Sequence, residues 1–391
     1  MAPAWSTEKP MTLRTADELQ RLANRRLPPF LAEYINGGSY AEHTLRRNVE
    51  DLRNIELRQR VLHDVSNVDT GSKLFGRECG LPLGLGPIGI SGMFARRGEV
   101  QAAQAAEQAN VPFCLSTVSI CSIEEVRAAL KVPFWFQLYM IRDRGFMAEL
   151  LDRATAAGCS ALIFTVDMPV PGIRYRDFRS GMSGISGWRA SVVRNWQAVR
   201  RPGWSFDVGL AGRPHTLGNL VKVLGARNSG LEDYVGWLGR NFDPSVTWRD
   251  LDWVRSRWKG PLIIKGILDV DDARAAATAG ADGIVVSNHG GRQFDGVRST
   301  ARALPGIADA VGNRLTVLVD GGVRTGLDVL RMVALGAHGV LLGRAWAYAL
   351  AAGGGPYVAN MLDTMKRELA TAMAMAGRTR IAAIDHTVLD R

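Results

Sequence analysis

Residues 315–343, LTVLVDGGVRTGLDVLRMVALGAHGVLLG, decide the fold of this chain. Two short apolar runs, Leu315–Asp320 and His338–Gly343, flank the segment Gly326–Leu335, whose pattern predicts a helix. Both runs are rich in Val and Leu with little polar alternation, as in parallel strands that are buried on both faces. The stretch therefore predicts a strand–helix–strand unit of a parallel sheet.

The same unit recurs along the chain from residue 81 onward, where apolar runs alternate with helical patterns. Eight such units in order favour a closed (β/α)8 barrel, the TIM barrel, over a doubly wound α/β sheet. The predicted strands are Leu81–Gly86, Val111–Ser116, Pro133–Tyr139, Ser160–Asp167, Pro261–Lys265, Asp282–Asn288, Leu315–Asp320 and His338–Gly343. Further predicted helices are Gly98–Asn110, Ile123–Leu130 and Asp271–Ala279.

Two parts of the chain lie outside this repeat. Residues 1–80 are predicted to form an N-terminal helical segment that covers the barrel, and residues 81–391 form the barrel itself. Residues 171–245 form an insertion between strands four and five that is rich in Gly, Trp and Arg. Such a long insertion in a barrel loop is more often functional than incidental. A final helical pattern has one apolar face, which is expected to pack on the barrel. That face carries Val358, Met361, Leu362, Met365 and Leu369.

Composition excludes several classes of protein. The 391 residues are 47% hydrophobic and 22% charged, which allows a large core, and no run approaches the ~18 apolar residues that span a bilayer. The N-terminal stretch has no apolar region of the signal-peptide type. The four cysteines form no CxxC pair, so we expect neither a disulfide frame nor a metal site. We expect the protein to be located in the cytoplasm, where cysteines stay reduced.

Much of the net charge of +10 is concentrated in one stretch. Residues 178–222 hold seven basic residues and only one acidic residue, Asp207. Such a patch could face nucleic acid, anionic lipid or an acidic substrate. Because no nucleic-acid-binding module accompanies it, nucleic acid is not expected as a partner.

Polar and ionisable residues gather where the predicted strands end. In a barrel of this type, the carboxyl ends of the strands form the active site. These ends are QLY at 137–139, TVD at 165–167, Lys265, SNHGGR at 287–292, DGGVR at 320–324 and GR at 343–344. We therefore expect a functional site at this end of the barrel.

Strands seven and eight carry a phosphate-binding pattern. Gly322 and Gly343 leave backbone N–H groups accessible, and Arg324 and Arg344 offer paired donors. Phosphate sites after these two strands recur in the fold, and a phosphorylated substrate or a phosphorylated cofactor would fit equally well. The stretch GLGPIG at 84–89 matches the dinucleotide fingerprint, but no helical pattern begins inside it, which argues against a Rossmann site.

A base and a carboxylate clamp can be assembled from other strand ends. His289 has an imidazole whose ordinary pKa of about 6.5 suits proton removal near neutrality, and Asp167 could hold that ring and stabilise its cation. Arg174 and Arg292 could bind a carboxylate, because a guanidinium presents paired donors. A lone His or a loop Arg is also common in structural roles, so the pattern by itself leaves both interpretations open.

With these residues the sequence resembles the FMN-dependent 2-hydroxy acid dehydrogenase/oxidase family. The motif SNHGGRQ at 287–293 is similar to the active-site signature of the family, which is long and specific. FQLY at 136–139, IKG at 264–266 and DGGVR at 320–324 support the resemblance, which covers nearly the whole chain. Within the family, the resemblance is strongest to bacterial respiratory L-lactate dehydrogenases, as in ARRGEVQA at 95–102.

The resemblance implies that the chain binds FMN and oxidises L-lactate to pyruvate, passing electrons to a quinone-type acceptor. It implies that His289 removes the substrate proton with support from Asp167, that Tyr139 hydrogen-bonds the reacting oxygen, and that Lys265 stabilises charge on the flavin. The residues expected to bind the substrate carboxylate are Tyr34, Arg174 and Arg292. The residues expected around FMN are Pro87, Ile88, Gly89, Ser116, Gln137, Thr165, Lys265, Ser287, Asp320, Gly322, Arg324, Gly343 and Arg344.

Three alternatives stay open at this point. Gly89 stands where glycolate-type members of the family carry alanine, which leaves room for (S)-mandelate or another aryl 2-hydroxy acid. An oxidase would use oxygen as its acceptor. A flavin-free barrel isomerase or aldolase would use the same phosphate pattern for a phosphorylated substrate.

The basic insertion and the resemblance together predict the partners. Trp prefers the bilayer interface and Arg favours anionic headgroups, so residues 178–222 are expected to contact the inner membrane peripherally from its cytoplasmic side. The resemblance also implies a homo-oligomer, a tetramer.

Overall fold

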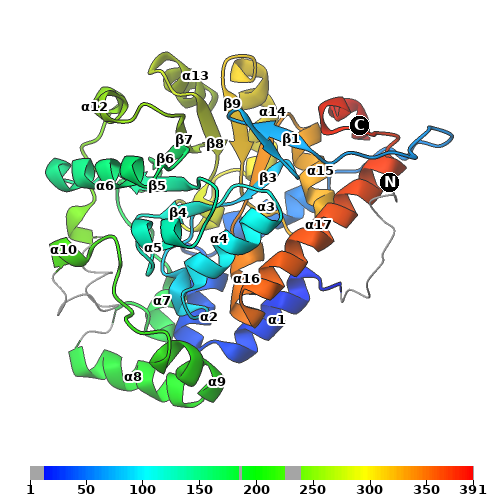
Figure 1. Ribbon diagram of the computed structural model, residues 1–391. Coiled ribbons are helices and arrows are strands. Elements are labelled where there is room, and N and C mark those ends of the chain that lie inside the picture. The colour runs from blue at the N-terminus through cyan, green and yellow to red at the C-terminus, as the bar shows by residue number, and fades with distance from the viewer. Residues whose placement is uncertain (1–12, 185–186, 225–238, 391) are drawn as a thin grey trace.

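A computed structural model describes residues 13–184, 187–224 and 239–390 of the chain and shows a closed barrel of eight parallel strands (Figure 1). The strands pair in chain order, and β10 pairs with β3. A parallel bridge between Leu85 and Phe113 joins β3 to the start of β4 and closes the barrel, so the predicted (β/α)8 fold is confirmed. The strands are β3 (Leu83–Leu85), β4 (Cys114–Ser116), β5 (Trp135–Tyr139), β6 (Ala161–Thr165), β7 (Leu262–Ile267), β8 (Gly283–Val286), β9 (Thr316–Val319) and β10 (Gly339–Leu342).

One helix follows each strand and lies outside the barrel. The predicted helices agree with the structure to within two residues at either end, because their apolar faces repeat at the helical period. These helices are α4 (Gly98–Gln108), α5 (Ile123–Ala128), α6 (Arg144–Ala156), α12 (Asp250–Arg257), α13 (Val270–Thr278), α14 (Thr300–Val311), α15 (Gly326–Ala334) and α16 (Arg344–Gly353). The last long helix, α17 (Gly355–Met375), packs its predicted apolar face on α4, α15 and α16.

The amino end of the barrel is closed by a β-hairpin that the sequence did not predict. β1 (Ser72–Leu74) and β2 (Arg77–Cys79) pair antiparallel around the turn residues Phe75 and Gly76, which both have positive φ. Leu74 and Cys79 join the apolar barrel interior, and the Phe75 ring packs edge-on against Trp135 at 5.7 Å. The expectation that residues 1–80 are helical is therefore incomplete for this stretch.

The N-terminal segment also contains three helices, which pack on the barrel away from the hairpin. They are α1 (Ala16–Arg26), α2 (Pro29–Asn36) and α3 (His43–Arg53), which pack on α16, on α7 and on residues His289–Gly291, respectively (Figure 1). Thr15 and Glu18 form a capping box that starts α1. These contacts carry α2 and α3 to the carboxyl end of the barrel, although the division of the chain at residue 80 remains a prediction.

The insertion is a set of short helices beside α2. It contains α7 (Tyr175–Ser180), α8 (Gly187–Val199), α9 (Pro202–Trp204), a π-helical turn (Ser205–Leu210) and α10 (Val221–Leu224), and its residues 185–186 and 225–238 lie outside the described part. In Figure 1, α8 and α9 project at the edge of the molecule, away from the strands. In the ranges described, no helix combines the length and apolarity that a bilayer-spanning segment needs. Three-residue 3-10 turns occur at Ser91–Met93, His289–Gly291, Ile381–Ala383 and His386–Val388.

Candidate active site

A cavity of about 340 Å³ opens at the carboxyl ends of the strands. Strand ends, α2 and the insertion all contribute to its lining, so it lies where the sequence predicted a site. The predicted residues that line it are Tyr34, Pro87, Ile88, Gly89, Tyr139, Thr165, Arg174, Lys265, His289, Arg292, Asp320, Gly322, Arg324, Gly343 and Arg344. The other four lie behind the lining and bind to it or to one another: Ser116, Gln137, Asp167 and Ser287.

His289 is held in place by its backbone and by Asp167. Its Nδ1 lies 2.9 Å from Oδ1 of Asp167, which follows β6. His289, Gly290 and Gly291 all have positive φ, a conformation that costs a side-chain-bearing residue roughly 1 kcal/mol. Glycine is required at 291, because a Cβ there would lie 2.5 Å from the backbone nitrogen of Leu45. Such local strain at a partly buried polar residue is typical of a functional position.

The electrostatics keep His289 neutral and Asp167 ionised. Burial lowers the pKa of His289, and the positive charge of Lys265 adds to this effect, while Asp167 acts in the opposite direction. Burial by itself would raise the pKa of Asp167, but the charges of His289 and Lys265 outweigh it and lower that pKa. A neutral imidazole that is oriented by a carboxylate can act as a base near neutral pH.

Lys265 is a buried cation with two partners. Its Nζ donates to Oγ of Ser287 at 2.9 Å and lies 3.1 Å from Oδ2 of Asp320. Burial would lower the pKa of Lys265, but Asp320 and Asp167 outweigh this and raise it, so the ammonium stays charged. The strand extends past Lys265 to Ile267, through a register irregularity, which corrects the predicted strand end at Lys265.

A chain of neutral hydrogen bonds crosses three neighbouring strands under the cavity. Ser116 donates to Oε1 of Gln137 at 3.1 Å, and Nε2 of Gln137 donates to Oγ1 of Thr165 at 3.0 Å. All three side chains are buried, and the chain fixes the direction of the Gln137 amide. Of the three, only Thr165 reaches the cavity.

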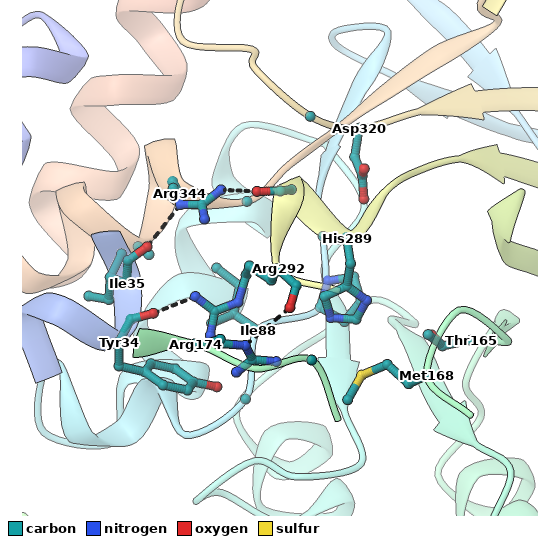
Figure 2. A pocket seen from close by; sticks show the side chains of 18 of the residues that line it. Tyr34, Ile35, Ile88, Thr165, Met168, Arg174, His289, Arg292, Asp320 and Arg344 are labelled. Carbon is teal, nitrogen blue, oxygen red and sulfur yellow. Dashed lines mark hydrogen bonds between the residues drawn. The ribbon is translucent and has the colours of Figure 1, made fainter. Parts of the chain in front are cut away.

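Arg174, Arg292 and Tyr34 lie beside His289 in the cavity (Figure 2), and Tyr139 also lines it. One guanidinium nitrogen of Arg292 donates to the backbone oxygens of Tyr34 at 2.5 Å and Gly37 at 2.9 Å, and its carbon lies 4.7 Å from the centre of the Tyr34 ring. Arg174 donates to the backbone oxygen of Arg292 at 3.3 Å. Burial raises the pKa of the Tyr139 phenol, with Tyr34 adding to the effect, so Tyr139 stays protonated and can donate a hydrogen bond.

The part of the cavity around Arg344, next to Arg292, is strongly cationic. Arg344 donates to the backbone oxygens of Ile35, Gly37 and Gly290, and burial lowers its pKa to about 9. In the residues described, Arg292, Arg324 and Arg344 form no ion pair with a carboxylate. Among the lining residues five cationic side chains face two carboxylates, and the ionised Asp167 behind the lining reduces the surplus to two positive charges. A desolvated surplus of this size calls for anionic ligands.

Several lining residues were not predicted from the sequence. The insertion adds Asp177, Phe178 and Met182, and the ring of Phe242 lies 5.0 Å from that of Tyr139. Arg174 forms an ion pair with Asp177 at 3.6 Å. The opposite charges three residues apart in RYRD at 174–177 could therefore have indicated Asp177 as a site residue. The apolar residues carried none, because their importance depends on contacts between distant parts of the chain.

Two further residues support the His289 turn from outside the cavity. Asn48 of α3 and Asn288 exchange two side-chain hydrogen bonds of 2.8 Å. Gln293 bridges the loops after β6 and β8, because its amide donates to the backbone oxygens of Asp167 and Val170. Both contacts join segments that are more than a hundred residues apart, and we expect them to fix the loops that carry the site.

Residues 23–391 match the protein family described as FMN-dependent dehydrogenase. The chain belongs to this family. A Caulobacter L-lactate dehydrogenase is 62% identical over 379 residues, which cover 97% of this chain and 99% of the relative. An L-lactate dehydrogenase of Acinetobacter baylyi is 58% identical over 97% of this chain and 98% of the relative. The crystal structure of the monotopic membrane protein (S)-mandelate dehydrogenase superposes with a TM-score of 0.89 and 32% identity, covering 97% of this chain and 99% of that one. The chain is accordingly an FMN-dependent 2-hydroxy acid oxidoreductase.

The residues of this cavity fit FMN. The buried Oδ1 of Asp320 has no hydrogen-bond partner among the residues that the structure describes, and it can accept from a hydroxyl of the ribityl chain. α16 starts at Arg344 with Gly343 as its N-cap, which places a helix N-terminus at the cationic end of the cavity. A phosphate of about −2 matches the surplus of two positive charges around the cavity.

Proposed function

We propose that this protein oxidises L-lactate to pyruvate with bound FMN. The observation that carries the proposal is the oriented His289–Asp167 pair, which shares one cavity with Arg174 and Arg292 in a member of an FMN-dependent family. Relatives that are about 60% identical over nearly their whole length carry the name L-lactate dehydrogenase, which favours lactate as the substrate.

The proposed roles follow from charge and hydrogen-bonding capacity. Neutral His289 takes a proton from the substrate, and Asp167 stabilises the imidazolium that forms. The carboxylate of lactate binds between Arg174 and Arg292, with the hydroxyl of Tyr34 as a further donor. Tyr139, which stays protonated, donates to the reacting oxygen.

We assign the cofactor contacts on the same grounds. FMN, when bound, accepts the two electrons that lactate loses. The ammonium of Lys265 supplies a fixed positive charge at the ring, and Thr165, Gln137, Ser116 and Ser287 orient the polar groups around it. Pro87, Ile88 and Gly89 form the wall along the ring, Asp320 binds the ribityl chain, and Gly322, Arg324, Gly343 and Arg344 bind the phosphate.

The decisive experiment is anaerobic bleaching of the bound flavin. The purified protein should be yellow, and L-lactate added under nitrogen should remove the absorbance near ~450 nm. Comparing kcat/KM for L-lactate and (S)-mandelate tests the substrate, because mandelate is the alternative favoured by the (S)-mandelate dehydrogenase similarity and by the room beside Gly89. A colourless protein that isomerises or cleaves a phosphorylated substrate would overturn the proposal.

We propose a membrane quinone as the electron acceptor. Lactate loses two electrons and two protons, and a quinone that takes up both becomes a quinol. If the enzyme were an oxidase, oxygen uptake with lactate would match the rate with a quinone. Oxygen consumption measured with and without a short-chain quinone separates these two acceptors.

The proposed membrane contact lies on α8, within residues 178–222. Trp188, Val192, Trp196 and Val199 recur at helical spacing on this helix, and each is more than half exposed. Arg189 and Arg200 lie over the rings of Trp188 and Trp196, at 5.6 and 4.6 Å from the ring centres. An apolar stripe edged by guanidinium groups suits the anionic surface of a bilayer, and we place it on the cytoplasmic side of the inner membrane.

The family resemblance also leads us to propose a homotetramer. Sedimentation of the purified protein in detergent measures its mass and would contradict this proposal if only monomers were present.

A further inference from the structure

A second cavity, of about 460 Å³, lies between the barrel and the insertion. Its volume falls within the range of roughly 300–1,000 Å³ that is usual for small-molecule sites. Its floor consists of buried apolar side chains, and its rim carries hydrogen-bond donors. The floor is formed by Phe30, Ile90, Met93, Ile120, Trp204 and Leu217. The donors of the rim are Ser191, Arg194, Asn195 and Arg213, while His215 also lines the rim but donates its Nε2–H to the backbone oxygen of Val208.

Three short segments separate this second cavity from the FMN cavity. The loop after β3 places Ile88 and Gly89 in the FMN cavity and Ile90 in the second cavity. The loop after β4 and helix α2 are divided in the same way. They place Val118 and Tyr34 in the FMN cavity, and Ile120 and Phe30 in the second. A ligand in the second cavity would therefore be separated from the flavin site by a thin apolar wall.

The second cavity also adjoins the surface that we place on the membrane. Ser191, Arg194, Asn195 and Ala198 of α8 line it, while the exposed apolar stripe occupies another face of the same helix. Leu210 both lines the cavity and is 60% exposed, so an apolar side chain continues from the cavity to the surface. An apolar ligand could pass between a bilayer and this cavity without crossing water.

We propose that the second cavity binds the head group of an isoprenoid quinone, the electron acceptor of the reaction. This inference rests on the proposed function. A quinone ring is flat and largely apolar, which suits the floor, and its two carbonyl oxygens accept hydrogen bonds, which suits the donors at the rim. The apolar tail would leave past Leu210 toward the bilayer.

Two substitutions that fill the second cavity, and one matched substitution that leaves it open, test this proposal. Ala198→Phe places a ring on the cavity face of α8, and Val199→Phe places the same ring on the neighbouring exposed position. Gly209→Leu fills the cavity from the other side; its Cβ would meet no atom closer than 3.8 Å, so the change is tolerated even if Ala198→Phe folds poorly. None of these residues lines the FMN cavity.

The first measurement is the binding of a short-chain benzoquinone to the holoenzyme in the absence of lactate. The quenching of tryptophan fluorescence reports this binding. We expect Kd to rise at least tenfold in Ala198→Phe and in Gly209→Leu and to stay within twofold of the parent protein in Val199→Phe. The KM for the quinone should rise in parallel. Flavin bleaching by lactate under nitrogen and the reduction of ferricyanide should be unchanged in all three variants.

Equal quinone binding in the filled and control variants would overturn the assignment. It would also be overturned if the filled variants lost a bound phospholipid chain from this cavity while their Kd for the quinone stayed unchanged. Failure of the proposed function gives a different result. In that case lactate leaves the flavin oxidised in every variant, while the quinone titration still reports whether the cavity binds its ligand.

Discussion

At the residue scale, the ionisable side chains of the proton-transfer part of the FMN cavity are held by partners that follow other strands. His289 is oriented by Asp167, and Lys265 is held between Ser287 and Asp320. Arg292 and Arg344 instead use backbone oxygens, so their positive charges stay available to anionic ligands. This difference separates a part of the site that moves a proton from a part that binds anions.

His289→Gln should retain FMN and lose roughly 10²- to 10⁴-fold in kcat, the usual contribution of a general base. The pH dependence gives a sharper test. Because burial lowers the pKa of His289, kcat/KM should rise with pH only at acidic values and be level above neutrality. Asp167 raises that pKa, so in Asp167→Asn the acidic limb should move to lower pH. Rate profiles from about pH 4 to 9 check both statements, and an unchanged limb in Asp167→Asn would argue against the pair.

Arg292→Lys should weaken the binding of the substrate carboxylate by roughly 10- to 100-fold, since an ammonium cannot replace a forked pair of donors. Oxalate, a dianionic mimic, can be titrated against the flavin spectrum to measure this loss without turnover. Flavin content should match that of the parent protein. An unaltered Kd for oxalate and KM for lactate would rule out the proposed carboxylate clamp.

At the element scale, regular segments were predictable and irregular ones were not. Apolar runs predicted the strands and helical periodicity predicted the barrel helices, because both patterns depend only on residues that are close in the sequence. The β1–β2 hairpin was missed because its strands are three residues long and Phe75, rather than Asn or Gly, occupies a left-handed turn position. The sequence predicted a membrane contact within residues 178–222, but it could not say which side chains of α8 are exposed, because that depends on which face the rest of the molecule covers.

The exposed stripe of α8 yields a prediction about membrane binding. Replacing Trp188 and Trp196 together with Ser should lower partitioning onto anionic vesicles at least tenfold, since each aromatic ring can bury more than 100 Å² in the interface. Val61→Ser with Leu62→Ser provides the control, because these apolar side chains are also more than half exposed but lie in the N-terminal segment. Vesicle flotation measures both; similar retention of the two double variants would exclude α8 as the contact.

At the scale of the whole molecule, the barrel collects charge at one end. The lining of the FMN cavity has three more positive than negative side chains, and the helix N-terminus of α16 adds to that potential. Phosphate recognition should therefore dominate cofactor affinity.

The phosphate contribution can be measured by comparing FMN with riboflavin on the apoprotein. FMN should bind at least 100-fold more tightly, and Arg344→Gln should weaken FMN by roughly 10- to 100-fold with little effect on riboflavin. Flavin fluorescence titrations give both constants, and FMN should also raise the melting temperature of the apoprotein more than riboflavin does. Equal affinities for the two flavins would contradict the phosphate assignment.

The sequence by itself determined the barrel, the order of its strands and the residues that the strand ends deliver to one site, because each depends on local patterns and on the general rule that parallel strands end at one edge. It also carried the family motif at 287–293. Only the tertiary structure decided which arginines have no carboxylate partner in the described part of the chain, that the hairpin closes the amino end, and that a second cavity lies behind Ile90 and Ile120. These features arise from contacts between segments far apart in the chain, whose energies no local pattern of residues records.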